Sequence, residues 1–174
     1  MVIWIVGLSG AGKTTIGKEV YSQIKNKYLN TVFLDGDEIR KVLQNDNGGH
    51  NYSIEGRKLN AERIIALCKV LDSQGINVVC SILCIFPDLL EENKSRFTKY
   101  IEVFADAPMT VLKNRDYKDL YRMASKGIDK NVVGVNIDFP RPKNPDLILD
   151  TSSLETFERN IQLVMEVFNE KRSK

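Results

Sequence analysis

Gly7-Leu8-Ser9-Gly10-Ala11-Gly12-Lys13-Thr14 follows the apolar run Val2-Ile3-Trp4-Ile5-Val6 and precedes residues with helical spacing. The stretch matches the pattern G-x-x-x-x-G-K-[ST] in full, and it lies between a strand and a helix as the pattern requires. Its glycines let the backbone turn tightly, so that successive N–H groups point into one concavity at a helix N-terminus, which suits a polyphosphate. The sequence therefore predicts a phosphate-binding loop, or P-loop.

Each residue of this loop has an expected role. Lys13 is expected to reach the β- and γ-phosphates of ATP, and the Thr14 hydroxyl is expected to ligate Mg²⁺. The remaining ATP contacts are expected from Gly7, Ser9, Gly10, Ala11, Gly12 and Thr15. The alternative is a glycine-rich turn that binds nothing, and eight matching residues in the required context argue against it.

Composition narrows the class of protein. A chain of 174 residues is long enough for one domain with a core, and we expect residues 1–174 to form a single domain. The net charge of +2 gives no reason to expect binding to nucleic acid. No apolar run approaches the ~18 residues of a membrane span, so we expect no membrane contact. Cys68, Cys80 and Cys84 are expected to be reduced thiols of a cytoplasmic protein.

Apolar runs alternate with helical repeats along the chain. Strands are predicted at residues 2–6, 31–34, 76–83, 100–104 and 147–149. Helices are predicted at residues 13–24, from a Ser53 cap to 74, from Pro87, at 108–115 and at 120–126. A last helix carries Leu154, Phe157, Ile161, Val164 and Phe168 at spacings of three and four. This alternation predicts an α/β P-loop fold, a five-stranded parallel sheet with helices on both faces.

A long loop interrupts this alternation. Residues 127–145 contain glycines and prolines with little periodicity. A loop of this length in a compact domain is usually functional, and we expect a lid that covers about residues 117–145.

Two carboxylates are expected near the P-loop. Asp35 and Asp37 follow the strand at residues 31–34, which we place beside the P-loop strand. Ligands of parallel sheets bind at the carboxyl ends of strands, so both groups are expected to face the same cleft. Either one can accept a proton from an acceptor hydroxyl or bind Mg²⁺ through water, and Asp35 is also expected to contact the acceptor. The alternative is an Asx turn with solvated carboxylates.

The acceptor is expected to be anionic. Arg40 lies three residues past Asp37, and Arg57 and Asn60 share one helical face at i and i+3. A guanidinium fork matches phosphate oxygens in a bidentate way. Tyr52 is placed to stack on a base. Each residue alone is more often a surface or packing residue, but their grouping around residues 45–51, a Gly- and Asn-rich loop, favours a binding site.

These motifs resemble the adenylylsulfate kinases over roughly residues 1–151. The resemblance covers the P-loop through Thr15, Leu34-Asp35-Gly36-Asp37-Glu38-Ile39-Arg40, Arg57-Lys58-Leu59-Asn60-Ala61-Glu62-Arg63, Arg115-Asp116, Leu120-Tyr121 and Asn144 to Thr151. It implies a P-loop kinase that uses ATP and Mg²⁺, and that phosphorylates the 3′-hydroxyl of a nucleotide with a modified 5′-phosphate. It also implies a homodimer, an ATP contact from Arg115, and acceptor contacts from Lys130 and residue 132.

The departures from the family lie on the acceptor side. The family holds adenine between two aromatic residues, of which Tyr52 matches the first. The second lies in a Lys-x-Phe-Thr-Gly segment that here reads Lys130-Asn131-Val132-Val133-Gly134, so Val132 replaces the aromatic residue. Cys84 replaces a phosphorylatable serine. The pattern is similar to a branch that phosphorylates cytidine diphosphoramidate in capsule phosphoramidate synthesis. Cytidine diphosphoramidate is therefore the leading hypothesis for the acceptor, with adenylyl sulfate as the alternative.

Two other classes remain as competing hypotheses. The first is a regulatory nucleotide switch. Guanine-specific switches resemble one another in an Asn-Lys-x-Asp motif that reads the base, and the nearest match in this chain, Asn93-Lys94-Ser95-Arg96, lacks the aspartate. A degenerate structural subunit has no need for an intact Lys13, Thr14 and Asp37. The residues leave open which of the two aspartates is the base.

Overall fold

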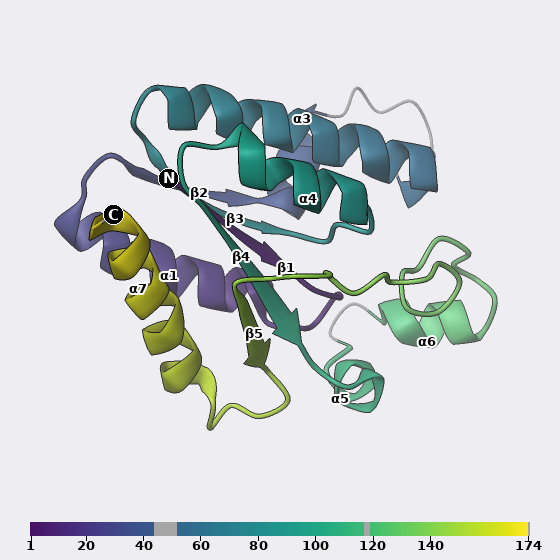
Figure 1. Cartoon of the computed structure of the whole chain (residues 1–174). Coiled ribbons are helices and arrows are strands. Elements are labelled where there is room, and N and C mark those ends of the chain that lie inside the picture. Colours follow the sequence, from purple (N-terminus) through teal and green to yellow (C-terminus); the bar gives the residue numbers. More distant parts are fainter. Residues whose placement is uncertain (44–51, 117–118, 174) are drawn as a thin grey trace.

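The computed structural model describes residues 1–43, 52–116 and 119–173. Five strands form one parallel sheet in the order β2-β3-β1-β4-β5 (Figure 1). The strands are β1 (Val2–Val6), β2 (Thr31–Asp35), β3 (Asn77–Ile82), β4 (Tyr100–Asp106) and β5 (Leu147–Asp150). The helices are α1 (Lys13–Lys27), α2 (Gly36–Leu43), α3 (Ile54–Ser73), α4 (Pro87–Arg96), α5 (Met109–Asn114), α6 (Leu120–Ser125) and α7 (Phe157–Ser173). The predicted α/β P-loop fold is confirmed.

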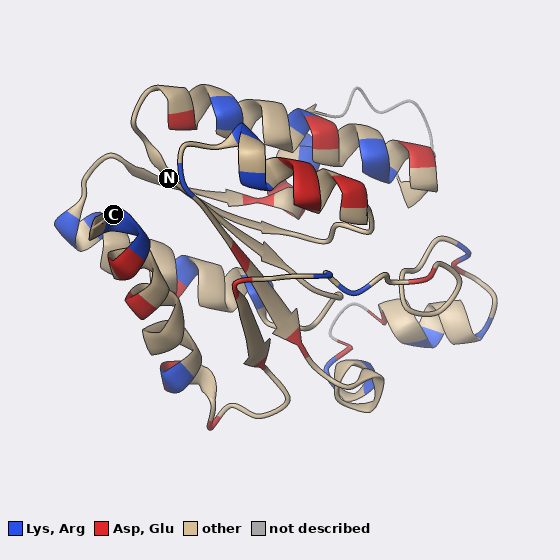
Figure 2. Cartoon of the chain, in the orientation of Figure 1, with Lys and Arg blue, Asp and Glu red and all other residues tan. Residues whose placement is uncertain are grey.

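Strand β1 is buried on both faces, which explains its unbroken apolar sequence. Ile3 and Ile5 point to one core cluster, which α1 and α7 cover. Val2, Trp4 and Val6 point to the other cluster, under α3 and α4 (Figure 1). The helices therefore cover both faces of the sheet. Positive and negative side chains intermingle along the outer surfaces of α3 and α7 (Figure 2).

Three expectations about the elements were wrong. Strand β2 does not lie beside β1, because β3 pairs with both of them. All six residues of β3 are buried, whereas β2 is only partly buried, so β3 takes the inner position and β2 the edge. Residues 36–43 form a helix, α2, that was not predicted. Leu154 precedes α7 and is 85% exposed, so it lies outside the buried face of that helix.

The predicted limits of α3 are close to those observed. The Ser53 side chain accepts a hydrogen bond from the Gly56 amide and caps the helix N-terminus. The chain turns away at the other end through Gly75, which has a φ of +74°. Near the end of the helix, the Asp72 side chain binds the amino group of Met1, the residue before β1.

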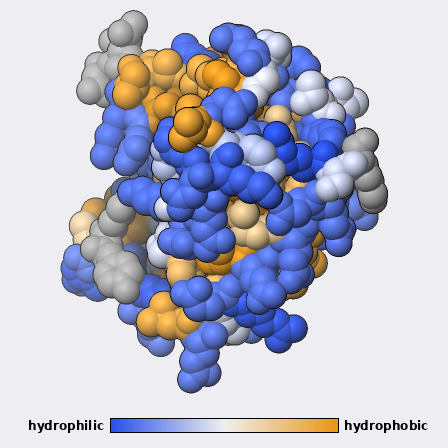
Figure 3. Space-filling model, turned by 90° about the vertical axis from the view of Figure 1, so that its left-hand side faces the viewer, coloured by the Kyte–Doolittle hydropathy of each residue, from blue (hydrophilic) through white to orange (hydrophobic). Residues whose placement is uncertain are grey.

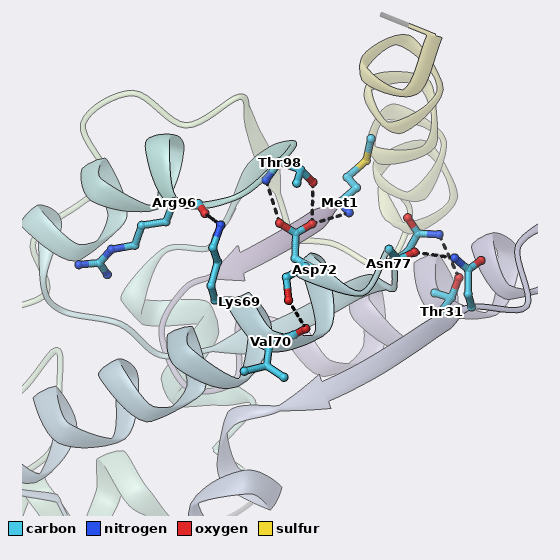
Figure 4. Close-up of polar contacts among 11 residues, drawn as sticks. Met1, Thr31, Lys69, Val70, Asp72, Asn77, Arg96 and Thr98 are labelled. Atoms are coloured by element: carbon cyan, nitrogen blue, oxygen red, sulfur yellow. Dashed lines mark hydrogen bonds and ion pairs between the residues drawn. The ribbon is translucent and has the colours of Figure 1, made fainter.

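Asp72 is a buried carboxylate that accepts hydrogen bonds from two other segments of the chain (Figure 4). Its Oδ1 accepts hydrogen bonds from the Met1 amino group at 2.8 Å and the Thr98 hydroxyl at 2.7 Å, and its Oδ2 accepts from the Thr98 amide at 2.8 Å. Burial raises the pKa of Asp72, but the hydrogen bonds and the amino group outweigh burial, so the pKa lies below its usual value. The ionised carboxylate thus ties α3 to the starts of β1 and β4.

We predict that Asp72→Asn lowers the free energy of unfolding by about 3 kcal/mol at pH 7, because it breaks a buried ion pair. A lowered native pKa stabilises the fold above the unfolded pKa of about 4, and the contribution is lost as pH falls through the native pKa. The difference between variant and wild type should therefore shrink in acid. Urea titrations at pH 7 and pH 3.5 measure it, with exposed Asp129→Asn as the control. Equal stability of Asp72→Asn and wild type at pH 7 would contradict the assignment.

Candidate functional site

The P-loop connects the end of β1 to the first turn of α1. Gly10 and Gly12 have φ values of +78° and +82°, in the left-handed region that other residues rarely adopt. Side-chain hydrogen bonds hold the loop: Lys13 Nζ donates to the Leu8 carbonyl at 2.7 Å, Ser81 Oγ to the Lys13 carbonyl at 2.9 Å, and Tyr121 Oη to the Ser9 carbonyl at 2.8 Å. The loop thus has the conformation that its sequence predicts.

Asp35 reaches the P-loop even though β2 is an edge strand. The Thr14 hydroxyl donates to Asp35 Oδ2 at 2.6 Å. Asp35 Oδ1 accepts from the backbone amides of Asp37 and Glu38 at 2.9 and 3.3 Å, and this contact caps α2. Asp35 therefore forms the Asx turn of the alternative reading, but its carboxylate is buried and bonded to the P-loop. Asp37 lies exposed on the first turn of α2.

The pair of Thr14 and Asp35 fits Mg²⁺ in its chemistry. A hydroxyl and a carboxylate oxygen are the hard ligands that Mg²⁺ prefers, and this ion usually takes one or two protein ligands together with water and phosphate oxygens. Among residues 1–43, 52–116 and 119–173, no cluster of three or more His, Cys, Asp or Glu side chains is arranged to hold a metal by itself. The protein part of the site is thus of the kind that needs the nucleotide to complete it.

Two buried arginines lie together near Asp37 and the Tyr52 ring. Arg40 and Arg57 are both buried, and their guanidinium carbons lie 4.9 and 5.5 Å from the centre of the Tyr52 ring. Burial lowers the pKa of both arginines, and the charge of Arg40 lowers the pKa of Arg57 further, while Tyr52 and Asp37 act in the opposite direction. Burying two cations beside one ring costs free energy, and a bound anion would offset that cost.

Asn60 completes this group, one helical turn after Arg57. It is 7% exposed, and its Nδ2 is fully buried without a hydrogen-bond partner among the described residues. Buried donors are normally satisfied, and an acceptor oxygen of a ligand is one group that could satisfy this amide.

The segment expected to be a lid contacts Arg57 directly. Arg57 donates through Nη2 to the Asn131 carbonyl at 2.8 Å and through Nε to the Tyr52 carbonyl at 3.0 Å. Lys130 is exposed. Val132 is 3% exposed and packs in the core cluster that includes Ala11 of the P-loop. The lid segment around Val132 is therefore part of the core.

Arg115 follows α5 and binds the loop after β5. It donates to the carbonyls of Thr151 and Ser152 at 2.7 and 3.0 Å. Arg115 also lies beside the P-loop, because a Cβ built on Gly10 would be 3.9 Å from the Arg115 Cβ.

A cavity of ≈ 720 Å³ was not predicted. It lies between the P-loop, the ends of β4 and β5 and the lid. On its wall, Arg141 makes a bidentate pair with Asp106, at 2.6 and 3.1 Å, and covers the Phe104 ring at 4.8 Å. Asp106, like Asp35, lies at the carboxyl end of a parallel strand, where ligands of such sheets bind, so it could have been predicted as a site residue. No pattern in the sequence points to Arg141.

Cys84 lies where the resemblance implies a phosphorylatable serine. Its side chain is buried, and burial raises the pKa of the Cys84 thiol to about 11, so it is protonated at neutral pH. Its Sγ faces the Phe86 carbonyl at 3.9 Å. All three cysteines are free and buried. The loop at residues 45–51, with His50, lies outside the described residues.

Sequence comparison identifies the family. The adenylylsulphate kinase family model matches residues 1–150. The chain therefore belongs to the adenylylsulphate kinase family. It is a kinase with a nucleotide substrate, built on the P-loop fold.

The chain is similar to proteins that are named for two different acceptors. The chain is similar to a cytidine diphosphoramidate kinase of Campylobacter jejuni, with 37% identity over 94% of each chain. It is also similar to an adenylyl-sulfate kinase of Halothermothrix orenii, with 36% identity over 98% of this chain and 90% of the other. A solved APS kinase of Mycobacterium tuberculosis, in complex with AMPPNP and APS, has 28% identity and a TM-score of 0.85 over 97% of this chain and 96% of that one. Identity alone does not separate the two acceptors.

We predict that Lys13→Ala and Asp37→Asn each lower kcat at least ~10²-fold, the usual loss when a charge stabiliser or a general base is removed. Turnover of ATP with the acceptor that the wild type uses measures both. The exposed neighbours Lys18→Ala and Glu38→Gln are the controls. A folded variant of either residue that turns over within a few-fold of wild type would remove that residue from the mechanism.

Proposed function

We propose that this kinase transfers the γ-phosphoryl group of ATP to the 3′-hydroxyl of a nucleotide with a modified 5′-phosphate. The observation that carries the proposal is the buried group of Arg40, Arg57 and Asn60 beside Asp37. Guanidinium forks and an unpartnered amide are suited to phosphate oxygens. The leading candidate for the acceptor is cytidine diphosphoramidate, as in capsule phosphoramidate synthesis, and adenylyl sulfate is the second candidate.

On the donor side, the proposal uses the P-loop. Backbone amides of residues 7–15 and Lys13 would hold the phosphates, and Arg115, which binds the Thr151 carbonyl beside the P-loop, would contact ATP. Thr14 and, through water, Asp35 would hold Mg²⁺, which neutralises charge on the transferred group. We assign the base for the acceptor hydroxyl to Asp37, because its carboxylate is exposed and lies near the charges of Arg40 and Arg57.

The choice of cytidine depends on the surroundings of the base. The Tyr52 ring is covered by two guanidinium groups and is still 51% exposed, so a base can stack on its open side. Val132 offers no second aromatic face, and its side chain is buried in the core. Stacking contributes on the order of 1–3 kcal/mol per base when measured by alanine substitution, so a purine loses more than a pyrimidine from a missing ring. Adenylyl sulfate stays a candidate because a relative named for it is 36% identical.

We predict a higher kcat/KM, with ATP, for cytidine diphosphoramidate than for adenylyl sulfate. Kinetics with both acceptors under the same conditions measure the preference. Cytidine 5′-diphosphate and adenosine 5′-phosphate are the controls, because each lacks the 5′-modification of its own acceptor and so measures the effect of that modification on one base. A clear preference for adenylyl sulfate would overturn the cytidine assignment and leave the second candidate. Phosphorylation of neither acceptor would refute the proposal as a whole.

We also propose that residues 1–174 form one kinase domain with a lid at about 117–145, which acts as a cytoplasmic homodimer. Free, buried cysteines are typical of a reducing compartment. In the described part of the chain no helix has both the length and the apolar character to span a bilayer. Apolar side chains gather at the top of the face in Figure 3. Several large apolar side chains of the chain are more than half exposed, among them Val42, Ile54 and Val70. Sedimentation as a monomer at micromolar concentration would contradict the dimer.

A further inference from the structure

Tyr121 makes a contact that the proposed reaction has not yet used. Its hydroxyl, on helix α6 of the lid region, donates a 2.8 Å hydrogen bond to the carbonyl oxygen of Ser9 in the P-loop, 112 residues away in the sequence. The side chain is 2% exposed and packs in one core cluster with Ala11, Leu112 and Val132. The ring therefore packs in the core, while the hydroxyl reaches one atom of the phosphate-binding loop.

The target of this hydrogen bond is significant because a peptide unit is planar. The Ser9 carbonyl and the Gly10 N–H belong to the same trans peptide, so they point in opposite directions. Tyr121 holds the carbonyl against the core, and the Gly10 N–H is then directed away from the core. Among the described residues the Gly10 amide makes no hydrogen bond, so it is available to an anion in the concavity of the loop.

This orientation needs a restraint. Gly10 has a φ of +78°, and glycine has access to a wide range of backbone conformations, so the peptide between Ser9 and Gly10 can turn over at low cost. A reversed peptide would present the Ser9 carbonyl to the phosphates and repel them. The Tyr121 hydroxyl supplies such a restraint from outside the P-loop, 112 residues away. Burial raises the pKa of Tyr121 to about 12, so the hydroxyl keeps its proton at any pH near neutrality.

We propose that Tyr121 is a positioning residue for phosphate binding, whose hydroxyl fixes the Ser9–Gly10 peptide so that the Gly10 N–H faces the polyphosphate of ATP. The inference rests on the proposed use of the P-loop for ATP and is independent of the identity of the acceptor. It also connects the lid region to the donor site, because α6 lies within residues 117–145. Tyr121 touches no reacting atom.

The test is Tyr121→Phe, which keeps the ring in the core and removes the hydroxyl. Loss of one oriented phosphate contact should raise the Kd of ADP, in the presence of Mg²⁺, about 5- to 10-fold. The Kd of inorganic tripolyphosphate should rise by the same factor, because the contact is to phosphate and not to the base. The KM of the acceptor should not change. The matched control is Tyr100→Phe: Tyr100 is also buried, and its hydroxyl donates to Glu102, away from the P-loop.

A spectroscopic readout separates orientation from stability. ADP binding should shift the Gly10 amide proton of the wild type downfield, and Tyr121→Phe should reduce this shift while Tyr100→Phe preserves it. Equal ADP and tripolyphosphate affinities in Tyr121→Phe and wild type would overturn the inference. If Tyr121→Phe does not fold, the wild type alone decides, because an unshifted Gly10 amide in the ADP complex would also overturn it. A wild type that binds no ADP would instead refute the proposed function.

Discussion

The hydrogen bond between the Thr14 hydroxyl and the Asp35 carboxylate joins the two halves of the site. Thr14 stands in the first turn after β1, and Asp35 stands at the end of β2, two strands away. They meet because parallel strands end at one edge of the sheet and because α1 crosses over β3, where Ser81 binds the Lys13 carbonyl. The same carboxylate caps α2, which carries Arg40, so the P-loop and the acceptor side share one anchor.

Much of the fold could be predicted because its signals are local. The P-loop sequence fixes a strand, a turn and a helix start, and Ser53 and Gly75 mark the ends of α3. The order of the strands is a different kind of property. The order of the strands depends on which strand is more buried, and it cannot be read from the residues within each strand. Helix α2 was not predicted, because an Asx turn at Asp35 does not by itself indicate that a helix follows it.

The candidate site shows the same division. Arg40, Arg57 and Tyr52 lie within 18 residues of one another, and they do come together. The pair of Arg141 with Asp106 spans 35 residues and joins the lid to the end of β4, and no local pattern announces it. Val132 is a second example of a residue whose surroundings the sequence does not predict. Alignment with a motif predicts which residue replaces an aromatic ring, but only packing determines that this valine joins the core.

The paired arginines also affect how the enzyme behaves before any substrate arrives. Arg40 and Arg57 raise the electrostatic potential at one point of the cleft, and their mutual repulsion is relieved by whichever anion enters first. Inorganic phosphate and sulfate have the right charge and size to do so. Under the proposed function, the composition of the surrounding solution, and not only the concentration of the nucleotide, would therefore set how much of the enzyme has an empty acceptor site.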